Sequence, residues 1–311
     1  MAGFLTRRLI HSVLTLFVVI TISFFMQRLA PGGPFDRERD VPEAVRVAEA
    51  KAWRLDEPLF VQYSDYLGGL ISFTPDLKRS MTRPDYRVVE LMIPRLKVSL
   101  SLGFAVLIFS LLVGIPLGAA AALAAHNRAG GYDHLAMGVA VVGISVPSFV
   151  LGPLLKWVFA LELGWFPESR WTGLSSMVLP VLALSALYIA TIARLTRSGM
   201  MEVLSEDWIR SARAKGLSEV QVVFKHALRG ALVPLVSYLG PAMASLAVGS
   251  VVIERVFNIP GLGNEFVDAA FNRDYTMVMG TVLVYSSLLI VMNILSDLGL
   301  AWVDPRLRLR R

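Results

Sequence analysis

The chain alternates long apolar stretches with polar segments, and this pattern predicts its main structural elements. A helix needs about 20 mostly apolar residues to cross a bilayer. Six stretches of about this length contain no Asp, Glu, Lys or Arg. They are Leu9–Gln27, Val98–Ala125, Leu135–Leu155, Trp171–Ala193, Gly230–Ile253 and Tyr275–Ser296. The pattern therefore predicts an all-α integral membrane protein with six membrane-spanning helices.

The polar segments suggest how the chain is divided. The first apolar stretch follows Arg7 and Arg8 as in a signal peptide, but it is long for that role and no small-residue cleavage site follows it. We therefore expect an uncleaved first transmembrane helix at 1–30 and an extracytoplasmic segment at 31–93. A core transmembrane domain follows at 94–304, with a polar loop near 197–231, and 305–311 form a basic tail.

Basic residues collect in alternate loops and orient the chain. The 194–229 loop carries seven Lys and Arg residues, and both termini are also basic, whereas the 156–170 and 254–274 loops carry two each. Lys and Arg are enriched in the cytoplasmic loops of membrane proteins. The distribution predicts that both termini and the 194–229 loop lie in the cytoplasm.

Composition supports this reading. The 311 residues are 55% hydrophobic and 17% charged, with a mean hydropathy of +0.60, whereas soluble domains carry roughly 25% charged residues. The net charge of +6 is explained by the basic loops and does not require a nucleic-acid partner. The chain has no cysteine, which removes disulfides and thiol metal sites from consideration.

The polar loop has the signals of two short helices around a glycine. Ser205 is placed to cap a helix whose first turn holds Glu206 and Asp207. Gly216 stands where a left-handed residue ends a helix. Ser218–Gln221 reads as a capping box that opens a second helix, Glu219–Leu228. An amphipathic helix of this kind fits the groove of a protein partner or the surface of an anionic membrane.

The residues of this loop resemble a known family. Arg210-Ser-Ala-Arg-Ala-Lys-Gly216, followed by His226-Ala-Leu-Arg229 and Pro234, is similar to the EAA loop of ABC importer permeases of the peptide/nickel branch. The general EAA pattern has a glutamate where Arg210 stands and a proline where Arg229 stands. The peptide branch also lacks the proline there and has a later one, as at Pro234.

Further strings recur along the whole chain in the order typical of this family. They are Thr21-Ile-Ser-Phe-Phe-Met26, Arg28-Leu-Ala-Pro-Gly-Gly-Pro34, Asp56-Glu-Pro-Leu59, Gly114-Ile-Pro-Leu-Gly118, Val146-Pro-Ser-Phe149, Pro260-Gly-Leu-Gly263, Asn272-Arg-Asp-Tyr275 and Val303-Asp-Pro-Arg306. Finer features, such as Ser148-Phe-Val-Leu-Gly-Pro-Leu154 and Ala190-Thr-Ile-Ala-Arg-Leu-Thr-Arg197, resemble the B membrane subunit of oligopeptide permeases.

The resemblance implies a type I importer transmembrane domain in a bacterial cytoplasmic membrane. It implies a heterodimer with a second homologous permease, two ABC ATPase subunits on the cytoplasmic side and an extracytoplasmic peptide-binding protein. No Walker A motif occurs, because Lys215-Gly216 has the reverse order and lacks a glycine-rich approach. ATP and magnesium are therefore expected on the partner ATPases, and no cofactor is expected in this chain.

Three groups of candidate site residues follow, with no catalytic residue and no metal ligand among them. The ATPase-coupling group is Asp207, Trp208, Ile209, Arg210, Ser211, Ala212, Arg213, Ala214, Lys215 and Gly216. The polar residues that could line a pathway are Ser145, Tyr188, Thr191, Ser237 and Tyr238, together with Ser99, Ser101 and Ser245. The outer gate or binding-protein contact is Pro260, Gly261, Gly263, Asn272, Arg273, Asp274 and Tyr275; a simple interfacial helix remains an alternative there.

Two other classes of protein fit less well. An intramembrane enzyme would need clustered zinc ligands or a serine paired with a base, but the four histidines are scattered near the ends of the apolar stretches. An ion-coupled carrier should place Asp, Glu or His within the bilayer, and only Asp297, at the end of the last stretch, is a candidate. A pure scaffold also remains possible on composition alone.

Overall fold

The computed structural model describes residues 2–35, 42–72, 77–126, 138, 146–169 and 171–303. Apart from loops and an isolated bridge between Arg79 and Arg87, these residues are helical, so the all-α prediction is confirmed. In chain order the elements are α1 (Ala2–Leu29), α2 (Glu43–Ala52), α3 (Leu59–Ile71), α4 (Val88–His126), α6 (Ser148–Leu155), η1 (Lys156–Glu162), α7 (Leu174–Leu204), α8 (Asp207–Ala214), α9 (Glu219–Gln221), η2 (Val222–Ala227), α10 (Leu228–Gly249), α11 (Val251–Val256), α12 (Leu262–Phe271) and α13 (Tyr275–Val303).

Five helical segments among the described residues are long and apolar enough to cross a membrane. They are Thr6–Leu29, Val88–His126, Leu174–Leu204, Glu219–Leu246 and Tyr275–Gly299, and each overlaps a predicted stretch. The remaining predicted span, Leu135–Leu155, is described only at 138 and from 146 onward. Its described end is α6, which continues without a break into the π-helix η1.

The helices extend beyond the spans that hydropathy predicts. The helix α4 begins at Val88, inside the predicted extracytoplasmic segment, and α7 continues past Arg194 and Arg197 to Leu204. The predicted helix Glu219–Leu228 and the span after it form one continuous helical stretch that breaks only at Ser250. The helices are longer than the uncharged stretches because a charged residue disfavours burial in the bilayer but does not end a helix.

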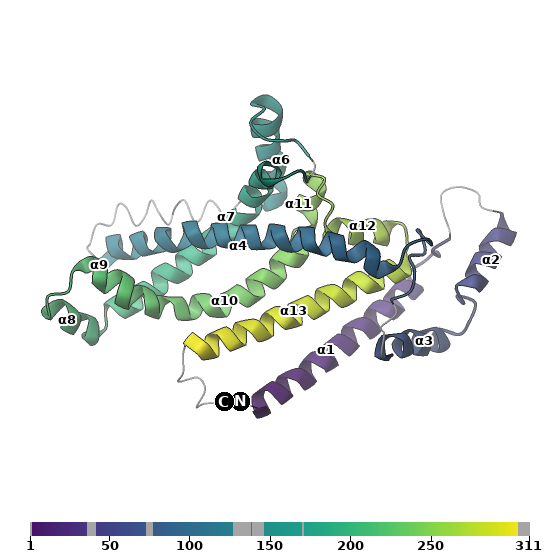
Figure 1. Ribbon diagram of the computed structural model, residues 1–311, viewed down its shortest axis with the longest axis horizontal. Coiled ribbons are helices and arrows are strands. Elements are labelled where there is room, and N and C mark those ends of the chain that lie inside the picture. Colours follow the sequence, from purple (N-terminus) through teal and green to yellow (C-terminus); the bar gives the residue numbers. More distant parts are fainter. Residues whose placement is uncertain are drawn as a thin grey trace.

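The long helices run alongside one another, and α8, α9, α2, α3 and α12 lie toward the two ends (Figure 1). The helix α8 lies toward the same end as the first residues of α1 and the last described residues of α13. The helices α2, α3 and α12 lie toward the opposite end, and α6 with η1 projects from the side of the bundle. The main apolar core joins α4, α7 and α10 through residues such as Leu102, Leu184 and Leu246.

Glycines allow α4 and α7 to cross closely. A Cβ atom at Gly118 would lie 2.3 Å from the carbonyl oxygen of Ala193, and one at Gly114 would lie 2.8 Å from Cγ2 of Ile192. Neither approach leaves room for a side chain. Small residues in this stretch therefore permit close contact between the two helices.

Candidate functional site

The helix α8 is fixed to the bundle by its apolar side. Ile209 is fully buried and Ala212 is almost so. They pack in a cluster, here called the α8 anchor, that brings together the ends of α4 and α7 with η2 and α10. Its buried members are Ala119, Ala122, Met200, Leu204, Ile209, Val222, Val223, Ala227 and Ala231. A movement of α8 must therefore displace the ends of several helices together.

The start of α8 differs from the prediction, whereas its end agrees. Ser205 does not cap α8: it follows the last residue of α7, and its hydroxyl donates to the carbonyl oxygen of Glu202 at 2.7 Å. Glu206 is the N-cap instead, without a side-chain hydrogen bond. Gly216 has φ +80°, the left-handed conformation that the sequence predicts. The predicted capping box between Ser218 and Gln221 is also present.

An ion pair spans the glycine turn. The guanidinium of Arg213 donates to both carboxylate oxygens of Glu219, at 2.8 and 3.4 Å. Arg213 thus connects the last turn of α8 to the first turn of α9. Arg210, in contrast, is largely exposed and meets only the exposed Asp207, at 3.4 Å, among the described residues. The geometry leaves Arg210 and not Arg213 available to an external partner.

The outward side of this unit is partly apolar. Trp208 is 47% exposed, and its ring and that of His226 meet edge to face with their centroids 5.8 Å apart. Val220 and Phe224, four positions apart beyond the glycine turn, are also exposed. Sequence reasoning missed these two residues, although their spacing on one helical face was a usable signal. Ser211 and Ala214 complete the exposed side of α8, and Lys215 and Gly216, which follow the helix, are also exposed.

The predicted pathway residues fall into different environments. The hydroxyl of the buried Tyr188 donates to Ser245 Oγ at 3.3 Å, between α7 and α10. Thr191 bonds the carbonyl oxygen of Leu187 within its own helix at 2.9 Å, and Ser237 does the same with Val233 at 3.3 Å. Tyr238 is partly buried, and Ser145 lies outside the described residues. Their role in a pathway stays a prediction.

Ser99 belongs to a buried carboxylate site instead. Glu254, in α11, is fully buried, and its Oε1 accepts hydrogen bonds from the hydroxyls of Ser99 and Ser250, each at 2.7 Å. Its Oε2 accepts from the backbone N–H of Asn264 at 2.9 Å. A buried carboxylate is tolerated only when such donors replace water. The site connects α4, α11 and α12.

The Pro260–Gly263 turn makes room for this carboxylate. A Cβ at Gly261 would lie 2.3–2.5 Å from the carboxylate atoms of Glu254, and one at Gly263 would lie 3.0 Å from its Oε2. The two glycines are thus required by close approach. Sequence reasoning missed Glu254, although an acid directly after an uncharged stretch and shortly before a glycine-rich turn was a usable signal.

The second part of the predicted outer group centres on Asp274. This buried residue caps α13, since its Oδ1 accepts from the backbone N–H of Met277 at 3.0 Å. It also accepts from the hydroxyl of Ser80 and from the hydroxyl and backbone N–H of Thr82, the latter two at 2.8 and 3.1 Å. Asp274 therefore holds the loop before α4 against the start of α13.

These donors set the protonation of Asp274. Burial by itself would raise the pKa of this carboxyl group. Hydrogen bonds from Ser80, Met277, Thr276 and Thr82 outweigh burial and keep the pKa below the ordinary value of 3.8. Asp274 is consequently a charged anchor at neutral pH.

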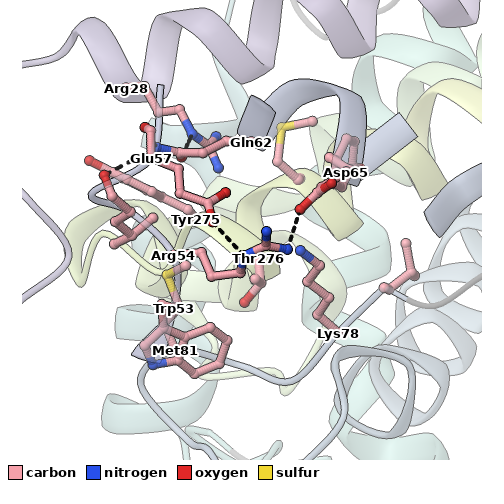
Figure 2. A pocket seen from close by; sticks show the side chains of 14 residues that line it. Arg28, Trp53, Arg54, Glu57, Gln62, Asp65, Lys78, Met81, Tyr275 and Thr276 are labelled. Carbon is pink, nitrogen blue, oxygen red and sulfur yellow. Dashed lines mark hydrogen bonds and ion pairs between the residues drawn. The ribbon is translucent and has the colours of Figure 1, made fainter. Parts of the chain in front are cut away.

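The neighbouring residues contact the turn after α1. Arg273 Nη1 donates to the carbonyl oxygen of Gly33 at 3.5 Å, and the Tyr275 hydroxyl donates to that of Gly32 at 3.4 Å. A nearby pocket is lined by Arg28, Arg54, Gln62, Asp65 and Tyr275 among others, and Figure 2 shows these side chains converging from α1, α3, α13 and the segment between α2 and α3. Within the described part of the chain, no group of three or more His, Asp or Glu side chains could hold a metal ion.

Known proteins agree with this architecture. Residues 114–309 match the family described as "Binding-protein-dependent transport system inner membrane component". The chain is 43% identical to the oligopeptide transport system permease protein OppB of Salmonella typhimurium, covering 99% of this chain and 100% of that one. It is 42% identical to the dipeptide transport system permease protein DppB of Bacillus subtilis, covering 100% and 99%.

A solved structure shares the fold. The chain aligns with a structure titled "Inward facing conformations of the MetNI methionine ABC transporter" at a TM-score of 0.58 and 21% identity, covering 70% of this chain and 97% of that one. The fold is that of an ABC importer transmembrane domain. The chain belongs to the binding-protein-dependent transport system inner membrane component family, as a permease subunit.

Proposed function

We propose that this chain is a membrane subunit of a bacterial peptide importer and forms the peptide pathway together with a second, homologous permease. The carrying observation is the identity of 43% and 42% to an oligopeptide and a dipeptide permease over nearly the full length of all three chains. Two such relatives at nearly equal identity support peptides as the class of substrate without favouring one length.

ATP hydrolysis would be coupled to transport through α8. Its apolar side is buried in the α8 anchor, whereas Trp208, Arg210 and Lys215 remain exposed. An exposed aromatic ring beside cationic groups fits a groove on a partner protein. The partner in this proposal is one of two ABC ATPase subunits, which carry ATP and magnesium, and this chain itself is not an enzyme.

The proposed setting is the bacterial cytoplasmic membrane, with both termini and α8 on the cytoplasmic side. The placement of α8 toward the same end as the start of α1 supports this arrangement (Figure 1), together with the basic residues of the 194–229 loop. The opposite end, with α12 and the 260–275 loop, would then face the extracytoplasmic peptide-binding protein.

The experiment is uptake by the reconstituted complex in proteoliposomes. Labelled peptides of two to eight or so residues, delivered by the binding protein, should accumulate only when ATP is present on the ATPase side. Full activity of an importer in which this chain is replaced by a second copy of the partner permease would contradict the proposal. Accumulation of a non-peptide cargo, with no peptide uptake, would overturn the substrate class.

A further inference from the structure

The helix α3 lies in the polar segment after α1, yet its composition is that of a membrane-contacting helix. It begins after Pro58 and contains one charged residue, Asp65, in its 13 positions. One side carries Tyr63, Tyr66, Leu67 and Leu70, which pack with Ile20 and Phe24 of α1 and Met279 of α13. This side attaches α3 to two helices that span the membrane.

The contacts place α3 beside the apolar part of α1, not beyond its end. The hydroxyls of Tyr63 and Thr21 lie 2.6 Å apart. Thr21 is six positions before Gln27, the last residue of the uncharged stretch, which corresponds to about 9 Å along a helix. Half of the hydrocarbon core is about 15 Å. Tyr63 therefore reaches a level well inside one leaflet, and α3 lies next to the later part of α1 in Figure 1.

The outward side of α3 is apolar and uncharged. Phe60 is 78% and Ile71 is 82% exposed, and Ser64 and Gly68 lie between them at spacings that keep all four on one helical face. The ring of Phe60 lies 6.1 Å from that of Phe25 in α1, beside the exposed Ile22 and Met26. The apolar side of α3 is thus continuous with the outward surface of a spanning helix.

The charged and amide side chains of α3 point elsewhere. Asp65 accepts from Arg54 Nη1 at 2.6 Å, and the amide of Gln62 donates to the carbonyl oxygens of Leu55 and Glu57 at 3.1 and 2.8 Å. Figure 2 shows Gln62 and Asp65 directed into the pocket formed with the loop before α3. Polar and apolar sides are therefore separated, as in helices that lie in a membrane interface.

We propose that α3 is an interfacial membrane anchor whose Phe60–Ile71 face lies among the acyl chains of the extracytoplasmic leaflet. Asp65 and Arg54 then face the headgroups and water. A binding protein is disfavoured as the occupant, because it would have to displace lipid beside α1 to reach this face. Only the choice of leaflet rests on the proposed orientation; the immersion of α3 rests on its contacts with α1 and α13.

Single cysteines test this directly, because the chain contains none. The variants Phe60→Cys, Ser64→Cys and Ile71→Cys carry a spin label in the complete complex, in lipid nanodiscs, with partner subunits free of labelled cysteine. The control is Val47→Cys in α2, which is 58% exposed on a charged helix. Collision rates with oxygen, which concentrates in the bilayer, and with a water-soluble nickel chelate are then compared.

The labels in α3 should collide more with oxygen, and the label at Val47 more with the nickel chelate, whether or not the binding protein is present. Nickel-accessible labels at all four positions would overturn the proposal. A second outcome would also overturn it: labels in α3 that are accessible to the nickel chelate without the binding protein and protected once the binding protein is added. That result would identify a docking surface for the binding protein. The readout needs no transport, so loss of uptake does not affect the result.

Discussion

Ser99 and Glu254 are 155 positions apart in the chain, and the hydroxyl of Ser99 donates a hydrogen bond of 2.7 Å to the buried carboxylate of Glu254. The same hydroxyl oxygen accepts from the backbone N–H of Leu262 at 2.8 Å. One serine side chain therefore connects α4 with α11 and with the first residue of α12. Removing either partner would leave buried polar groups unsatisfied, which is costly.

The Glu254 site predicts that two substitutions are not additive. A methyl group at position 261 would overlap the Glu254 carboxylate, so Gly261→Ala should destabilise the protein by about 1–3 kcal/mol, the usual cost of overpacking. In the Glu254→Ala background the same substitution should cost much less, because the overlapping atoms are gone. Thermal unfolding of the purified complex measures each step. If Gly261→Ala cost the same in both backgrounds, the contact between the two residues would be contradicted. The control is Gly68→Ala, because Gly68 has open space around it.

Asp274 predicts a defined pH dependence. Because its pKa is lowered on folding, its stabilisation is complete above the ordinary value and is lost as the pH falls through the lower folded value. The difference in unfolding temperature between the native protein and Asp274→Asn should be equal at pH 7 and pH 5 and should shrink below about pH 4. Asp268→Asn removes an exposed pair with Arg255 and should have little effect at any pH. A difference that already shrinks between pH 7 and pH 5 would rule out this account.

Gly216 predicts a loss of coupling with little loss of membrane assembly. A β-branched side chain at φ +80° is strained by roughly 1–3 kcal/mol, so Gly216→Val should change the angle between α8 and α9. Peptide-stimulated ATP hydrolysis and uptake should both fall, while the complex still assembles. Gly68→Val places the same side chain at a helical glycine without positive φ and serves as the control. Normal stimulation and uptake in Gly216→Val would refute the role of this turn.

The two sides of α8 predict opposite phenotypes. Ile209 is fully buried, so Ile209→Ala should lower the free energy of unfolding by about 2–5 kcal/mol. Trp208 is half exposed, so Trp208→Ala should change stability little but should weaken binding of the ATPase subunits. Thermal unfolding of the isolated permease pair and affinity for the ATPases separate the two effects. If Trp208→Ala lowered stability as much as Ile209→Ala and left binding intact, α8 would not be the proposed contact.

The local features of the fold could be predicted from the sequence. Gly216 and the Ser218–Gln221 capping box were predicted because a left-handed residue and a cap depend on neighbours within four positions. The spans of α1, α4, α7 and α13 were predicted because solvation by lipid selects apolar residues. The helix ends at Val88 and Leu204 were not predicted. Hydropathy indicates which residues lie in the bilayer, and it does not indicate where a helix begins or ends.

The tertiary contacts could not be predicted. Glu254 reads locally as a polar residue after a span, and only packing brings Ser99 and Gly261 to its carboxylate. Arg213 reads as a basic residue available to a partner, but folding across Gly216 pairs it with Glu219. Ser205 was expected to cap α8; the preceding helix α7 continues to Leu204 and takes its hydroxyl, which left Glu206 as the N-cap.

The close crossing of α4 and α7 at Gly118 has a mechanical consequence. Side chains between two helices can change rotamer and absorb a small relative displacement, but a contact between one backbone and another has no such compliance. A shift of α7 by a fraction of an ångström must therefore be transferred to α4 almost undiminished. Since α7 leads to α8, a small movement at one end of the bundle should reach the other with little loss.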